Sequence, residues 1–170
     1  MRRYTAWLYA ADRVLAGVFL VGVLVMVMAG VAARLVGVNV RGTDAYAGYC
    51  MAAAAFLGLA PTLLSGGHIR VDALLNALSP ARRRLMERAG ASVALAIAVF
   101  LAYYSVRLAW QSYLFGDISQ GNDATPLWIP QIAMAFGSVS LAIAFIETLV
   151  DARGVAPPPH ISLEASPILD

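Results

Sequence analysis

The chain has 170 residues, of which 61% are hydrophobic and 13% are charged, and its net charge is +2. Soluble domains contain roughly 45–50% apolar and about 25% charged residues, so this composition excludes a water-soluble globule of this size. A lipid bilayer must provide part of the solvent for these side chains.

Four apolar runs predict an all-α membrane domain over residues 1–153. Transmembrane helices are expected at about 14–36, 45–67, 86–112 and 126–150, because each run is close to the ~20 residues that cross a hydrocarbon core. The first run could instead be the apolar part of a signal peptide, since "MRR" and "VAAR" resemble a basic start and a cleavage site. Its length favours a membrane anchor.

The connection between the second and third spans predicts a short amphipathic helix at about 70–78. Its apolar residues recur at helical spacing, and so short a helix fits the membrane interface rather than a span. Ser79 followed by Pro80 is typical of a helix start. Four arginines then lie where anionic headgroups attract them, as lipid or topology anchors. These anchors are Arg82, Arg83, Arg84 and Arg88.

The arginines also predict the orientation of the chain in the membrane. All twelve basic residues are arginines, and nine of them lie in the two termini and the middle loop. Four spans place these three segments on one side, which the positive-inside rule makes cytoplasmic. The tail at 154–170 contains three consecutive prolines and is expected to be extended or disordered there.

Small residues recur every four positions along the first and third helices. Such stripes allow helix backbones to approach closely, so they predict packing against a membrane partner, although alanine-rich helices also produce them by chance. The residues are Ala29, Ala33 and Gly37 in the first stripe and Gly90, Ala94, Ala98 and Ala102 in the second.

Several classes of function lack the residues that they need. A complete ion-coupled carrier or a small stand-alone oligomeric exporter requires an acid deep in the membrane, and none is expected there. A haem subunit requires paired histidines inside the spans. The single Cys50 and the isolated His68 are too few for a metal site. No enzyme motif occurs, and neither a cofactor nor a nucleic-acid partner is expected.

Three short motifs together resemble one family of membrane proteins. Gly67, His68, Val71 and Asp72 form a G-H-I-x-V-D pattern after the second span, Arg34 lies near the end of the first helix, and "TPLWIP" precedes the fourth. Their order and spacing resemble the DctQ family, the small membrane subunits of tripartite ATP-independent periplasmic (TRAP) transporters. The resemblance covers about 10–151. The family usually has paired glutamates at the start of the second helix, where this chain has only Asp44.

The resemblance implies a non-enzymatic subunit of the bacterial inner membrane. It implies that this chain scaffolds a large transporting subunit and helps to dock a periplasmic binding protein during ion-coupled uptake of an organic anion. From the residues themselves we expect the docking surface at the charges of the two outer connections, Arg41, Asp44, Asp117 and Asp123. His68, a single histidine beside a glycine corner, is expected to have a structural role with Asp72 as a partner. The first alternative is an assembly or scaffold subunit of another membrane complex, and the second is a small stand-alone oligomeric exporter.

Overall fold

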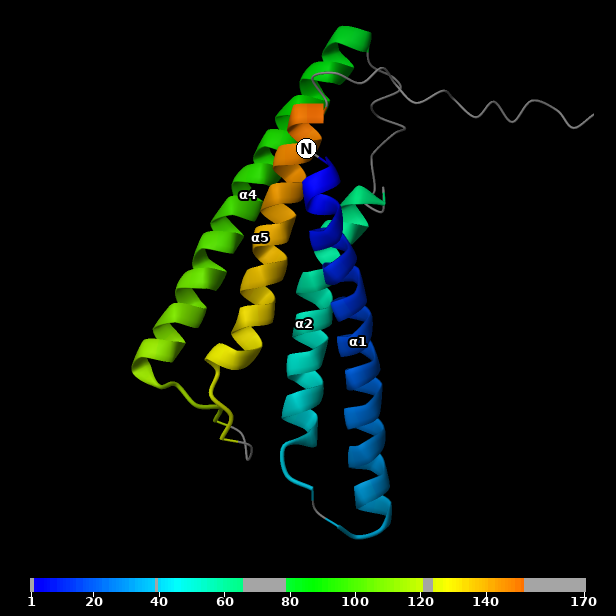
Figure 1. The fold of residues 1–170 in the computed structure, drawn as a ribbon, viewed down its shortest axis with the longest axis vertical. Coiled ribbons are helices and arrows are strands. Elements are labelled where there is room, and N and C mark those ends of the chain that lie inside the picture. Colours follow the sequence, from blue (N-terminus) through cyan, green and yellow to red (C-terminus); the bar gives the residue numbers. More distant parts are fainter. Residues whose placement is uncertain (1, 39, 66–78, 121–123, 152–170) are drawn as a thin grey trace, which may run out of the picture.

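The computed structural model describes residues 2–38, 40–65, 79–120 and 124–151, and these form an all-helical chain (Figure 1). Its helices are α1 (Arg2–Leu35), α2 (Thr43–Leu64), α4 (Pro80–Phe115) and α5 (Trp128–Asp151). All four are long and apolar enough to cross a membrane. The prediction of an all-α fold with four spanning helices is therefore confirmed.

Some predicted features lie outside the described residues. They are the interfacial helix at 70–78, the signature residues Gly67, His68, Val71 and Asp72, the acid Asp123 and the tail at 154–170.

The two ends of the molecule are named by the parts of the chain that they contain. We call the end with the α1–α2 and α4–α5 connections the hairpin end, and the opposite end, where α1 begins and α5 finishes, the terminal end (Figure 1).

The four helices form a row rather than a closed bundle. α1 packs on α2, α2 on α5 and α5 on α4, while α1 and α5 touch only briefly. In Figure 1, α4 and α1 accordingly flank the central pair. Burial agrees with this arrangement, because 44% of the residues in the candidate span of α5 are buried but only 6% of those in the span of α1. A row leaves long apolar faces of both flanking helices open to lipid or to another protein.

The central helices α2 and α5 cross at Gly137, which is buried. A Cβ atom at this position would overlap the carbonyl group of Phe56 and lie 2.8 Å from the backbone nitrogen of Leu57. Only glycine therefore permits this approach of the two backbones, which is the usual way in which helices pack closely in membranes. Gly22 and Gly30 have a related role on α1, where added Cβ atoms would lie 3.2 Å from Cys50 Sγ and 3.1 Å from Thr43 Oγ1.

Glycines also end two of the helices at the hairpin end. Gly37 has a φ of +74°, the Gly37 N–H donates to the Arg34 carbonyl, and the Val38 N–H donates to the Ala33 carbonyl at 2.9 Å. This pattern is a Schellman motif, in which glycine adopts the left-handed conformation without penalty. Gly116, with a φ of +64°, ends α4 in the same conformation. At the other end of α4, the helix begins at Pro80, directly after Ser79, as the sequence predicts.

Candidate functional site

The hairpin end carries an ion pair between the last turn of α1 and the first turn of α2. Arg34 Nη2 lies 2.9 Å from Asp44 Oδ2 and 3.2 Å from Asp44 Oδ1. Each charge is also favoured by its own helix, because a cation suits a helix C-terminus and an anion suits an N-terminus. Both side chains are largely exposed, so the pair itself contributes only about 0–1 kcal/mol.

The two described parts of the α4–α5 connection, on either side of 121–123, contact each other at the same end. Ile118 and Pro126 face each other in an isolated β-bridge, and the Ser119 N–H donates to the Thr125 carbonyl at 2.8 Å. Two tyrosines of α2 attach this connection to the row: Tyr49 donates to Ser119 Oγ at 2.8 Å, and the Thr125 hydroxyl donates to Tyr46 at 3.0 Å. The connection is therefore fixed to α2 as well as to its own two helices.

Three of the four predicted docking residues lie at the hairpin end. All three are exposed there: Arg41 precedes α2, Asp44 lies in the first turn of α2, and Asp117 follows α4. Arg41 and Asp44 also line a surface hollow of about 580 Å³ between the end of α1 and the start of α2. Their common location is consistent with one polar surface, and contact with a binding protein stays a prediction.

The predicted packing stripes divide between the interior and the surface. Ala98 and Ala102 are buried in the chain's own core against Leu141, Ala142 and Phe145 of α5, and Ala94 packs at the edge of that core. Gly90 faces open space, Ala29 is exposed and Ala33 is buried. Gly37 follows the end of α1 rather than lying within it. The part of the α4 stripe from Ala94 to Ala102 therefore serves internal packing.

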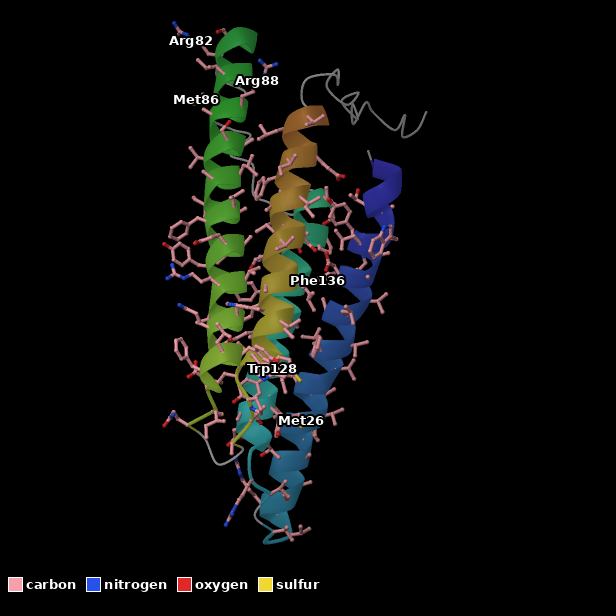
Figure 2. The ribbon with its side chains drawn as sticks, turned by 60° about the vertical axis from the view of Figure 1, so that its left-hand side comes forward. Met26, Arg82, Met86, Arg88, Trp128 and Phe136 are labelled. Atoms are coloured by element: carbon pink, nitrogen blue, oxygen red, sulfur yellow. The ribbon has the colours of Figure 1, made fainter. Side chains whose placement is uncertain are left out.

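The predicted anchor arginines lie in the first part of α4 at the terminal end. Arg82 and Arg88 are exposed, and Figure 2 shows them with Met86 at the tip of this helix. Arg83 and Arg84 belong to the same helical segment. α4 has 36 residues, or about 54 Å at 1.5 Å per residue, which exceeds the ~30 Å hydrocarbon core. The arginine-bearing turns can therefore extend into the headgroup region.

A polar cluster that the sequence analysis missed lies between α1 and α5 near the terminal end. Glu147 is only 7% exposed, and its two carboxylate oxygens accept hydrogen bonds from Thr5 at 2.6 Å and from Tyr9 at 2.9 Å. Hydrogen bonds to a charged acceptor are stronger than neutral ones, particularly where water is excluded. They therefore hold the beginning of α1 against α5. We call Thr5, Tyr9, Asp12, Ser140 and Glu147 the terminal-end cluster.

Asp12 is the unusual member of this cluster. It is completely buried, and within the described residues neither carboxylate oxygen has a hydrogen bond of standard geometry. The hydroxyl of Ser140, also buried, is the polar group that interacts with it from α5. Thr5, Tyr9 and Asp12 follow one another at i, i+4 and i+7, so helical spacing alone could have revealed one polar face on α1.

The comparison with protein families gives the chain its identity. A model of the DctQ component of tripartite ATP-independent periplasmic transporters matches residues 23–154. A comparison with curated protein sequences gave no match. The matched region contains the last part of α1, from Val23 to Leu35, and all of α2, α4 and α5. Since it covers well over half of the chain, the protein belongs to the DctQ family, as a multi-pass, non-enzymatic membrane component of a TRAP transporter.

Proposed function

We propose that this chain is the scaffold of the membrane part of its transporter. It holds the large transporting subunit through α1, while the hairpin end faces the periplasm and helps to dock the binding protein that delivers an organic anion for ion-coupled uptake. The observation that carries this proposal is the row of helices, in which α1 packs along α2 on one side and leaves its other sides open, so that only 6% of its span is buried.

The exposed face of α1 is a regular stripe. Its members recur with alternating spacings of four and three residues, so they share one side of the helix. The side opposite to them holds Gly22 and Gly30, which face α2. The stripe consists of Gly17, Val21, Leu24, Met28 and Val31, all exposed. Lipid tails are as apolar as these side chains, so a partner must bind here by close packing rather than by a hydrophobic driving force.

A co-purification experiment tests the use of this stripe. The chain is expressed with the large subunit of its own transporter, and the double variant Val21→Trp, Leu24→Trp is compared with the parent in mild detergent. We expect bulky indoles on the stripe to prevent close packing and to release the large subunit.

The matched control places the same indoles on α4, as Val93→Trp, Ile97→Trp. These residues are 60% and 63% exposed, comparable to 60% and 61% for Val21 and Leu24. Release of the large subunit by the α4 variant but not by the α1 variant would assign the contact to α4 and contradict the proposal.

The proposed orientation is tested by cysteine labelling in a Cys50→Ser background. Gln120 at the hairpin end and Ser79 at the terminal end are both exposed. An impermeant thiol reagent added from the periplasm is expected to label Gln120→Cys and to leave Ser79→Cys unlabelled. The reverse pattern would place the termini in the periplasm.

The docking role is tested by charge reversal of the loop acids. Asp117→Lys with Asp123→Lys is expected to slow uptake most at low ionic strength, because exposed charges mainly tune the rate of encounter. Assembly of the two membrane subunits should remain intact. Uptake kinetics equal to the parent at every salt concentration would remove the acids from the docking surface.

A further inference from the structure

A groove runs along the contact between α4 and α5 on the outside of the row. It has a volume of about 750 Å³ and extends from Val99 to Trp110 on α4, beside Val139 to Ile146 on α5. Its floor is shallow because Ala102 and Ala142 meet there, and both are at most 9% exposed. All residues that line it are apolar or aromatic except one, Arg107.

Arg107 is exposed at one end of this groove, inside the candidate span Arg88–Phe115. It lies eight residues before the end of α4, or about 12 Å at 1.5 Å per residue. Within the part of the chain that the structure describes, no hydrogen bond or ion pair involves its guanidinium group. No acid lines the groove. A charge at this depth costs up to about 2.5–3.5 kcal/mol on insertion scales, so an anion that reaches it would stabilise it.

The aromatic residues near Arg107 indicate the depth in the membrane at which such an anion would lie. Trp110 and Tyr113 follow it by one and two turns, and Tyr113 packs edge-on against Trp128 at a centroid distance of 5.7 Å. Such aromatic groups prefer the level of the lipid headgroups. A long arginine side chain can extend its polar end several ångströms toward that level. The Arg107 guanidinium can therefore meet a headgroup phosphate of the nearer leaflet.

We propose that this groove binds one phospholipid molecule of the leaflet at the hairpin end, with its phosphate on Arg107 and one acyl chain along the groove toward Val99 and Ile146. One property favours a lipid over a partner helix. The groove is polar at one end and apolar over the rest, as a phospholipid is.

The energetics make the phosphate contact decisive. An acyl chain gains no hydrophobic free energy by moving from the bilayer into a groove, because both are apolar. Selective binding must therefore come from the charge-assisted hydrogen bonds of a guanidinium to a phosphate, with the groove adding shape.

Native mass spectrometry of the purified full chain, with added phosphatidylglycerol, tests the proposal. The parent is expected to retain one lipid per chain, and Arg107→Gln to retain about tenfold less at equal lipid concentration. Arg107→Lys keeps the charge and is expected to keep most of the binding. Arg13→Gln is the matched control, because Arg13 is exposed on α1, on the far side of the central pair from the groove, and it should bind as the parent does.

A second variant makes the test independent of the folding of Arg107→Gln. Val106→Trp keeps the arginine and fills the groove, since Val106 lines it and is 48% exposed. It is expected to lower lipid retention to a similar degree. Unchanged retention in either variant overturns the proposal. If Arg107→Gln keeps its lipid but loses the large subunit, the groove is a subunit contact and the proposal is also wrong.

Discussion

The two ends of the row use the same kinds of polar side chain in opposite environments. At the terminal end, Glu147 is 7% exposed and accepts two hydroxyl hydrogen bonds between α1 and α5. At the hairpin end, the side chains of Arg34 and Asp44 are 67% and 84% exposed although their pairing geometry is as good. Because water and ions compete only at the second site, the hydrogen bonds of the first contribute more to holding α1 in place.

The crossing of α2 and α5 lies between the two ends and holds the central pair together. Disrupting it should cause the largest loss of stability. Gly137→Ala places a Cβ into the Phe56 carbonyl group, so the two central helices must move apart. We expect a loss of about 3 kcal/mol or more in stability, beyond ordinary overpacking because the obstacle is backbone. Thermal unfolding in detergent measures it. Gly58→Ala on α2 meets nothing within 4 Å and should be neutral or slightly stabilising.

Removal of the Glu147 carboxylate should have the next largest effect. In Glu147→Leu the hydroxyls of Thr5 and Tyr9 lose their acceptor in a buried site, which we expect to cost about 2 kcal/mol. Loosening of α1 should appear as faster hydrogen exchange at residues 5–12. Tyr9→Phe should cost about 1 kcal/mol and couple with Glu147→Leu in a double-mutant cycle. Additive effects would show that the two groups do not interact.

Asp12 should behave in the opposite way to Glu147 although both are buried acids. No standard hydrogen bond is lost in Asp12→Asn or Asp12→Leu, whereas an unsatisfied buried carboxylate is removed. We therefore expect stability that is unchanged or about 1 kcal/mol higher in the same unfolding measurement. A loss as large as that of Glu147→Leu would contradict this expectation and would mean that Asp12 has a strong partner, either Ser140 or a group of another molecule.

The smallest effect is expected at the hairpin end. Asp44→Asn should change stability by less than about 1 kcal/mol, because the pair with Arg34 is exposed. The difference from the parent should shrink further as salt is added. A loss comparable to Glu147→Leu would erase the distinction between the two ends and show that the pair is covered in the assembled transporter.

The four spans could be predicted from the sequence because each is a long apolar run. The family could be predicted because the motifs typical of it occur in this chain in the expected order. The sequence did not predict how the spans face one another. Average hydropathy is the same for every rotation of a helix, so Gly137 could not be recognised as the crossing point. The polar face of Thr5, Tyr9 and Asp12 was visible in its spacing, but its acceptor Glu147 lies 142 residues from Thr5. Likewise, nothing in the spacing of Ala98 and Ala102 distinguishes internal packing from a partner.

The row of helices also limits how events at its two sides can influence each other. α1 and α4 have no contact within the described residues, and each touches the central pair along one side. Changes at sites that share no neighbours add independently. Occupation of the groove beside α4 and binding of a protein to α1 can therefore be coupled only if α2 and α5 shift together. Gly137 allows these two backbones to meet without intervening side chains, so we expect α2 and α5 to form a rigid pair. Binding of a lipid beside α4 should therefore not change the affinity of α1 for a protein partner, and the reverse should also hold.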